Sequence, residues 1–425
     1  LFILEKSNYA MQKEVFNLKT VAIIGTFDSK GNEYSYIREI IKKLGLSTLT
    51  IHCGTFDPSF KPDVSNTEVA AAAGAKITEI VAKKDRALAT EIMSKGAEAL
   101  VPRLYAQGKF DGIISLGGSG GASIATPAMR ALPIGVPKIM VTTMASGDTS
   151  QYVGVSDVNM FPSIVDVSGI NSVSARIFAN AAHAIAGMVK FNEPISFEKK
   201  PVIAATMFGV TTPCIDYARK YLENQGYEVL VFHATGTGGK TMESLIEGGY
   251  IDGVLDITTT ELCDELVGGV LSAGPHRLEA AGKHHVPQVV SVGALDMVNF
   301  GPPETVPQKF KGRNFYQHNP TVTLMRTSIQ ENKRLAEIIA EKLNRAESPT
   351  ALILPLKGIS MIDANGQAFY GEKEDKMLFN TISQKIDHNK IELIDRNNHI
   401  NDKEFAICAC DKLIELMKIG KQAKK

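Results

Sequence analysis

Tryptophan is absent from this chain of 425 residues, and neither sign of charge is in excess. Lys and Arg together number 46, and Asp and Glu together also number 46. A chain with no net charge lacks the broad basic surface that nucleic acids or anionic membranes require. No apolar run is as long as a membrane-spanning helix. We therefore expect neither a nucleic-acid partner nor a membrane partner.

Cysteines are few, and their spacing is not that of a metal site. An odd number, 5, in a large chain without a secretion signal favours the reducing cytoplasm. Cys408 and Cys410 are two positions apart in a predicted helix and point to different faces. His284 and His285 are adjacent, which is not helix spacing, so we predict no metal site. The first ten residues, before Met11, lack a cleavage site and are interpreted as an upstream remnant.

Strands and helices alternate along the chain, and one pattern occurs twice. Residues 21–55 and 202–237 share a strand, a turn, a helix stopped by glycine, and a second strand ending in Gly-Thr. Residues 191–201 mix proline and charge without periodicity, which indicates a linker. The sequence predicts an α/β protein with two Rossmann-like doubly wound parallel-sheet domains related as an internal repeat. Their predicted bounds are 1–195 and 196–425, with a long loop at 296–320 in the second domain.

The stretch HATGTGGKT, residues 233–241, nearly matches a phosphate-binding P-loop. Lys240 and Thr241 fit its end, but Ala234 replaces its first glycine. The stretch also follows the second strand of its domain, whereas a P-loop follows the first. We therefore interpret the resemblance to a P-loop as superficial. Two alternatives remain open: a cradle of backbone N–H groups for an anion, or a turn that needs glycine only for positive φ. The cradle would use Gly236, Gly238 and Gly239.

A second glycine cluster, LGGSGGAS, follows the third strand of the first domain. It places Gly117, Gly118, Gly120 and Gly121 around Ser119, directly before a predicted helix. Such a turn lets a phosphate approach the backbone, and the helix that follows adds positive potential. The cluster resembles the phosphate-binding turn of phosphofructokinase-like folds, with Ser119 in place of an Asp. The alternative is close packing of the helix on the strand. We favour a ligand site, because ligands bind at the carboxyl ends of parallel strands. We also expect a positive φ at Gly118.

Polar loops follow the other strands of the first domain. After the first strand, Asp28 would hold a ribose hydroxyl or a metal-bound water, and Lys30 would hold a phosphate. The alternative is an ordinary helix cap with a solvated lysine. Convergence of several loops on one sheet edge favours a nucleotide site in the first domain, with the second domain or a shared cleft as the competing locations. The predicted cofactor-binding residues of these loops are Gly25, Thr26, Asp28, Lys30, Gly54, Thr55, Arg86, Thr142 and Thr143.

The sequence assigns no catalytic residue. It has no Gly-x-Ser-x-Gly nucleophile elbow, and no His or Asp can be matched to Ser119 as a partner. The long stretch around residues 296–326 carries further polar candidates, because loops of this length tend to be functional. For any single one of them, a satisfied surface charge is the simpler interpretation. These candidates are Asp296, Glu304, Arg313, His318 and Arg326.

Eight motifs, in order, resemble one known family: the ATP-binding domain of the tomato mosaic virus resistance protein and its uncharacterised bacterial and fungal relatives. The match runs from about Val21 to Leu416 and covers nearly the whole chain. The motifs are GTFDSKGNE, HCGTFDPSFKPDVSNTEVAAAAG, LGGSGGAS, TTMASGDTSQYVG, HATGTGGKTMESLI, GALDMVNFGPPETVP, HNPTVTLMRT and HINDKEFA.

The resemblance implies two Rossmann-like subdomains, binding of ATP with Mg²⁺, and a homodimer. The plant region also binds a viral replication protein and continues into a barrel-like module, before which this sequence stops. Antiviral activity is therefore not carried over, and a barrel partner would be separately encoded. Since the family has no established reaction, two functions remain open for a cytoplasmic protein. One is an ATP-using enzyme of unknown substrate, and the other is a nucleotide-regulated dimeric module that binds proteins without turnover.

Overall fold

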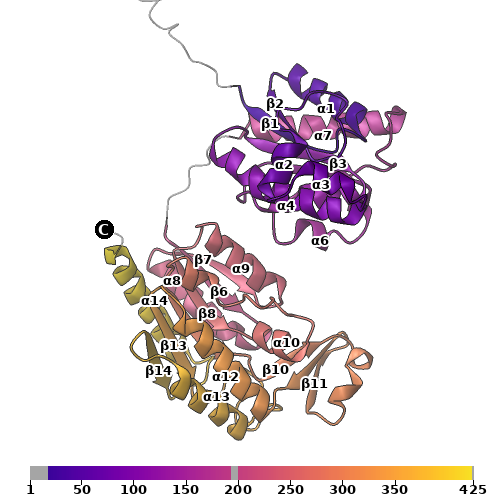
Figure 1. Ribbon diagram of the computed structural model, residues 1–425. Coiled ribbons are helices and arrows are strands. Elements are labelled where there is room, and N and C mark those ends of the chain that lie inside the picture. Colours follow the sequence, from indigo (N-terminus) through magenta and orange to yellow (C-terminus); the bar gives the residue numbers. More distant parts are fainter. Residues whose placement is uncertain (1–17, 193–199, 424–425) are drawn as a thin grey trace, which may run out of the picture. The chain divides into compact units, whose positions relative to one another are not determined.

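The computed structural model describes residues 18–192 and 200–423, which form two compact units (Figure 1). The border between unit 1 and unit 2 falls near residue 196. Most of the linker predicted at 191–201 lies outside the described residues, and so does the whole of the predicted remnant at 1–10.

Unit 1 contains a parallel sheet with the strand order β2-β1-β3-β4-β5. The order reverses between β1 and β3, and such a switch point is where open α/β sheets bind ligands. Every residue of β3 is buried, as expected for a strand covered on both faces. The strands are β1 (Thr20–Gly25), β2 (Ser47–His52), β3 (Gly112–Gly117), β4 (Lys138–Thr142) and β5 (Asn159–Pro162).

Helices cover both faces of this sheet. Successive strand residues point to opposite faces, so Ala22 and Ile24 pack against one helix layer and Val21 and Ile23 against the other. The first layer is α2 (Asn66–Ala72), α3 (Ile77–Ala82), α4 (Arg86–Ala106) and α5 (Ser119–Arg130). The second layer is α1 (Gly31–Lys43) and α7 (Ser172–Lys190). After β4 come the short helices η1 (Thr143–Ser146) and α6 (Ser150–Val153).

Unit 2 repeats this plan with one more strand. Its parallel sheet has the order β14-β13-β9-β8-β6-β7, which matches unit 1 when the strands of each unit are counted along the chain. The predicted fold class, two parallel-sheet domains related as an internal repeat, is therefore confirmed. The strands are β6 (Val202–Met207), β7 (Glu228–His233), β8 (Gly253–Thr258), β9 (Gln288–Gly293), β13 (Thr350–Pro355) and β14 (Ile391–Arg396).

The helices of unit 2 also form two layers. On one face lie α8 (Thr212–Asn224) and α14 (Lys403–Ala423). On the other lie α9 (Thr237–Glu247), α10 (Glu261–Val267), α11 (Ala280–Lys283), α12 (Ile329–Asn344) and α13 (Glu372–Lys385). The short helix η2 (Gly209–Thr211) follows β6. Across residues 18–192 and 200–423, no helix has the length and apolar character needed to span a membrane.

A small antiparallel sheet, which we call the arm (residues 297–326), lies between β9 and α12 (Figure 1). It contains β10 (Met297–Phe300), β11 (Phe315–Asn319) and β12 (Val322–Arg326), in the order β10-β12-β11, with η3 (Pro303–Thr305) and η4 (Gln308–Phe310) between β10 and β11. The stretch predicted as a loop at 296–320 thus contains two strands, which pair with β12. The amide of Thr327 donates to the carbonyl of Asp296 at 3.0 Å, so the ends of the arm meet.

Because each unit has its own sheet and its own cores, we expect each to fold without the other. Residues 1–196 and 197–425, produced as separate proteins, should each show helical circular dichroism and a cooperative thermal transition. A fragment that stays unfolded until the other is added would contradict this expectation.

Candidate functional site

The loops of interest in unit 1 leave from one edge of the sheet. Gly117 and Thr142 are register partners at the ends of β3 and β4, and Gly25 ends β1 beside them in the sheet order. Because the strands are parallel, the segments that follow them start at the same edge. The structure therefore places the loops after β1, β3 and β4 together at the carboxyl edge.

The four glycines after β3 divide into two kinds. A Cβ atom on Gly117 would lie 2.9 Å from the Cα of Gly121, and one on Gly121 would lie 3.2 Å from the carbonyl oxygen of Leu116. These two glycines therefore allow α5 to pack closely on β3. Among the described residues other than its chain neighbours, a Cβ atom on Gly118 would have only Thr143 Oγ1 within 4 Å, at 3.8 Å, and one on Gly120 would have only Arg86 Nη2, at 3.7 Å. Gly118 and Gly120 therefore face open space.

The backbone of Gly118 differs from the expectation. Gly118 is the N-cap of α5, with φ −76° and ψ −157° and no side-chain cap hydrogen bond. The expected positive φ is wrong, because an extended N-cap joins β3 to α5 without a left-handed residue. Any amino acid can adopt this backbone. Open space, and not conformation, is what glycine provides here.

Arg86 brings a positive charge to the start of α5. It is the first residue of α4, which packs along α5, and its exposed guanidinium lies beside Gly120. The side chain of Asp85 caps α4 by accepting from the amides of Ala87 and Leu88, which fixes the first turn that carries Arg86. The amides of the first turn of a helix have no partner within the helix, and the helix dipole is positive there. Glycine amides and a guanidinium thus converge on one open position.

The loop after β1 is held by contacts within unit 1. Asp28 accepts from the amides of Ser29 and Phe56, at 2.8 Å and 3.0 Å, and so ties the loop after β1 to the loop after β2. A Cβ atom on Gly54 would lie 2.3 Å from the Asp28 carboxylate, so that loop needs glycine there, next to Thr55. The ammonium of Lys30 donates to the carbonyl of Val167. In the structure Lys30 is therefore neither the solvated lysine of the alternative interpretation nor directed only at a ligand, since the chain itself supplies an acceptor.

The remaining predicted residues of unit 1 have packing roles. A Cβ atom on Gly25 would overlap the ring of Tyr34, which is fully buried and donates to the carbonyl of Leu116. Thr26 Oγ1 accepts from Ser29 Oγ at 2.9 Å, and Thr142 Oγ1 accepts from the amide of Met144 at 3.2 Å. These contacts shape the edge of the sheet around the open position.

The glycine turn of unit 2 does bind an anion, and that anion is the chain's own carboxylate. Glu261 Oε1 accepts from the amides of Gly236 and Gly239, at 2.7 Å and 3.0 Å. Gly236 has φ +82°, and a Cβ atom on Gly238 would lie 1.9 Å from the carbonyl oxygen of His233. Both interpretations of the turn thus have support: it needs a positive φ, and its amides form an anion cradle. Lys240 is exposed at the start of α9.

A buried arginine holds Glu261 in this position. Arg277 is fully buried, and its Nε donates to Glu261 Oε2 at 2.7 Å. Its two terminal nitrogens bind both oxygens of Asp256, at 2.5 Å and 2.7 Å, and a weaker contact reaches Glu243 at 3.4 Å. Burial raises the pKa of Glu243. Asp256 lies in β8, and its carboxylate is thus fully engaged by Arg277. Sequence reasoning missed Arg277, because nothing in its neighbourhood distinguishes it from a surface arginine.

A second buried cluster lies where the arm joins unit 2. Arg326 Nη2 contacts Asp375 at 2.7 Å and Asp363 at 3.4 Å, and Asp296 is fully buried beside them. Burial raises the pKa of Asp296 to about 7 and that of Asp375 to about 8. Arg313 pairs with Glu331 at 2.6 Å. Within the part of the chain that the structure describes, no cluster of His, Cys, Asp and Glu is arranged to hold a metal ion.

Comparisons with known proteins identify relatives along the whole chain. Residues 19–194 match the N-terminal domain of the uncharacterised protein family UPF0261, and residues 200–417 match its C-terminal domain. A UPF0261 protein from Clostridium tetani is 56% identical over 400 residues, which are 94% of this chain and 99% of that protein. The ToMV resistance protein Tm-1(GCR237) from Solanum lycopersicum is 41% identical over 94% of this chain, but the match spans only 56% of the tomato protein.

Solved structures give only distant similarity. UDP-N-acetylglucosamine 2-epimerase from Rickettsia bellii is 12% identical, with 94% of this chain and 96% of that chain covered and a TM-score of 0.23. A score this low has no bearing on function.

The occupied cradle of unit 2 makes a prediction about Lys240. Replacing Lys240 with Ala should lower whatever affinity the chain has for ATP by about tenfold at most, because the neighbouring amides already bind Glu261 and Lys240 would contribute only one exposed charge. Isothermal titration with ATP measures the change. A loss of several orders of magnitude in a folded variant would show that Lys240 grips phosphate as a P-loop lysine does.

The buried aspartates make a prediction about pH. A folded-state pKa near 7 or 8, above the unfolded value of about 3.9 for Asp, means that the folded state binds more protons between these limits. The stability of unit 2 should therefore fall as pH rises from 5 to 8, by up to about 1.4 kcal/mol per pH unit for each extra proton held. Asp296→Asn should flatten this dependence.

Hydrogen exchange in β9 and α12, followed from pH 5 to 8 and corrected for the intrinsic exchange rate, measures this effect. Glu304→Gln, at an exposed carboxylate, is the matched control and should leave the slope unchanged. Equal slopes for Asp296→Asn and the unmodified chain would contradict the assignment.

Proposed function

The chain belongs to the uncharacterised protein family UPF0261, and from that premise we propose that unit 1 binds ATP at the N-terminus of α5. The observation that carries the proposal is the open space at Gly118 and Gly120, with Arg86 Nη2 at its border. The resemblance to the ATP-binding domain of the tomato resistance protein points to the same ligand. The position after β3 also adjoins the switch point of the sheet, as expected for a nucleotide site.

In the proposed complex, the phosphates lie against the first turn of α5. The amides of Ser119, Gly120 and Gly121 would donate to phosphate oxygens, and the helix dipole would add positive potential. Arg86 would supply a planar guanidinium suited to phosphate, and the hydroxyl of Thr143 lies next to Gly118. The amides of Gly236 and Gly239 already serve Glu261, which favours unit 1 over unit 2.

Asp28 would face the sugar or a metal-bound water. Its two oxygens each accept one backbone amide and retain lone pairs for a ribose hydroxyl. Mg²⁺ usually keeps several waters and is bound through substrate phosphates. We therefore propose that Mg²⁺ arrives with ATP, and that Asp28 accepts a hydrogen bond from one of its waters.

Two functions follow from ATP binding, and we favour a nucleotide-regulated module that binds proteins as a cytoplasmic homodimer. The groups around Gly118 and Gly120 are the guanidinium of Arg86 and the hydroxyl of Thr143. These two groups donate to phosphate and do not act as a base toward an attacking water, and the carboxylate proposed nearby, that of Asp28, faces the sugar or a water on Mg²⁺ in this proposal. An ATP-using enzyme, working with a separately encoded barrel partner, is the alternative. Phosphate release with ATP and Mg²⁺ would support the enzyme, and an ATP-dependent dimer without turnover would support the module.

Replacing Gly118 with Val should abolish most ATP binding while the fold is retained. The φ of −76° accepts a β-branched residue, and within the described residues the new Cβ has only Thr143 Oγ1 nearby beyond its chain neighbours, so the side chain would fill the space proposed for phosphate. Titration with ATP should show a loss of about a hundredfold or more in affinity. Gly209→Val, at an exposed and equally open glycine of unit 2, is the matched control. Unchanged affinity in folded Gly118→Val, or loss only in Gly209→Val, would move the site out of unit 1.

Arg86 tests the same site through charge. Arg86→Ala should weaken ATP binding by about tenfold to a hundredfold, since a guanidinium–phosphate contact would be lost. Arg103→Ala, at an exposed arginine in the last turn of the same helix, should leave the affinity unchanged. Equal effects of the two substitutions would show that only the net charge of α4 matters.

A further inference from the structure

The arm of unit 2 has an open strand edge. In the order β10-β12-β11, β12 is central, and β11 pairs with β12 on one side only. All five residues of β11 are exposed, among them the large side chains of Phe315 and Tyr316. An exposed edge of this kind is a template for pairing with another strand.

The register of the arm shows which backbone groups face outward. The amide of Arg326 donates to the carbonyl of Asn314 at 2.9 Å, so this pair faces inward, toward the shared ladder. Inward and outward residues alternate along an antiparallel strand. The backbone amide and carbonyl groups of Tyr316 therefore point toward β12. Those of Phe315 and Gln317 point away from the sheet.

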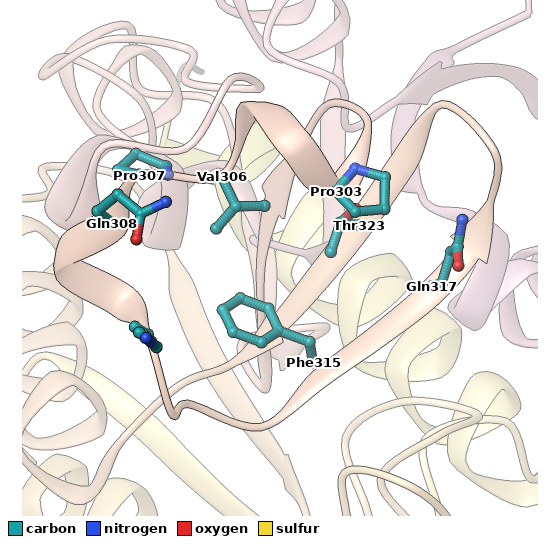
Figure 2. A pocket seen from close by; sticks show the side chains of 8 residues that line it. Pro303, Val306, Pro307, Gln308, Phe315, Gln317 and Thr323 are labelled. Carbon is teal, nitrogen blue, oxygen red and sulfur yellow. The ribbon is translucent and has the colours of Figure 1, made fainter.

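The same two residues border a cavity of about 580 Å³ (Figure 2). Side chains two apart on a strand share one face, and Figure 2 shows the Phe315 ring directed toward the space that Val306 and Pro307 border. Tyr316, on the other face, packs edge-on against Phe369 with ring centroids 6.2 Å apart. The cavity is lined by Pro303, Val306, Pro307, Gln308, Lys311, Phe315, Gln317 and Thr323.

The lining includes four polar side chains, and two of them, Thr323 and Lys311, bear on the kind of ligand beyond the neutral amides of Gln308 and Gln317. Thr323 is only 4% exposed, and its Oγ1 has no hydrogen-bond partner among the residues that the structure describes. A buried hydroxyl without a partner costs stability unless a ligand completes it. Lys311 adds an ammonium, and no carboxylate belongs to the lining. The cavity therefore offers apolar walls, the amides of Gln308 and Gln317, the ammonium of Lys311, and a buried hydroxyl without a partner among the described residues.

We propose that the edge of β11 and its cavity form a docking site for an extended, acidic peptide segment of a partner protein. The segment pairs with the outward amide and carbonyl groups of Phe315 and Gln317 and adds a fourth strand to the arm. Its side chains alternate, so one that points to the cavity face enters beside Phe315. A carboxylate there pairs with Lys311 and accepts from Thr323 Oγ1.

Charge distinguishes this occupant from a second copy of the chain. A second copy would offer its own β11, Phe315–Asn319, which has the sequence FYQHN and carries no carboxylate. It would offer Lys311 and Thr323 Oγ1 only the neutral amide oxygens of Gln317 and Asn319 and no negative charge. A small carboxylic acid would bind the Lys311 ammonium and accept from Thr323 Oγ1, but it would leave the edge of β11 unpaired. An acidic peptide in extended conformation matches both features.

Selection of random nine-residue peptides, displayed on phage, against the full chain tests the proposal. Enriched sequences should place Asp or Glu two positions from an apolar residue, with no proline between them. A synthetic peptide of the best sequence is then titrated by fluorescence anisotropy. Lys311→Glu should weaken binding by about tenfold or more, and Lys309→Glu, on a nearby lysine outside the lining, by less than about twofold.

Two further variants separate the strand edge from the cavity. Gln317→Pro removes one outward amide and no bond to β12, so it should weaken binding by about tenfold while the arm stays folded. Thr323→Val keeps the shape and removes the unpartnered hydroxyl. It should weaken binding about threefold or more without lowering the thermal midpoint, a combination that a purely structural hydroxyl would not give.

Three results would overturn the proposal. The first is that no acidic extended sequence is enriched. The second is that the enriched peptides bind Lys311→Glu and Gln317→Pro as tightly as the unmodified chain. The third is a dimer in analytical ultracentrifugation that Gln317→Pro dissociates, which would assign the edge to a second copy.

Discussion

The candidate site depends on one close approach between a helix and a strand. Helix α5 can begin directly at the end of β3 only because Gly117 and Gly121 carry no side chains where the two elements touch. A methyl group on Gly117 would press on the backbone of the helix and push its first turn away from the sheet. The free amides of that turn would then no longer lie beside Arg86 and Thr143. The packing glycines therefore determine where the helix dipole points, and the open glycines beside them determine what can reach it.

The two units use the same topology but fill it differently. In each unit the loop after the second strand is closed by a carboxylate of the chain itself. In unit 1 Asp28 closes this loop from the end of the first strand, and in unit 2 Glu261 closes it from the end of the third. In unit 2 the segment after the third strand thus makes contacts within the chain, and Arg277 balances part of its buried charge. In unit 1 the corresponding segment remains open. One duplicated framework can therefore close this position in one half and leave it open in the other.

Periodicity was enough to predict the two parallel sheets, because both faces of such strands are buried and the strands appear as continuous apolar runs. The repeat was likewise visible, since equivalent strands and helices recur in order. The arm was not predicted, because Phe315–Asn319 is a short exposed strand without clear alternation and long-range pairing with β12 is what defines it. For the site, sequence located the glycine cluster but not the roles within it. Whether a glycine packs or leaves space depends on what lies across from it, as Gly117 and Gly118 show. The contacts of Lys30 and Arg277 could not be predicted either. Their partners, Val167 and Glu261, are not neighbours in the sequence and are brought close only by the fold.

The hydrogen bond between Thr327 and Asp296 closes the arm at its base, while Val298, Phe300 and Met325 of the arm pack into the core that β9 and α12 share. The chain leaves the parallel sheet and returns to it at a single point, so the separation of β9 and α12 does not depend on what lies between. The entropy of closing a loop grows only slowly with its length. An excursion anchored in this way can lengthen, shorten or change its surface while the six-stranded sheet retains its register. Within the arm, substitutions in the exposed strand β11 should therefore cost less stability than substitutions in β10 and β12, which are buried in the core of unit 2.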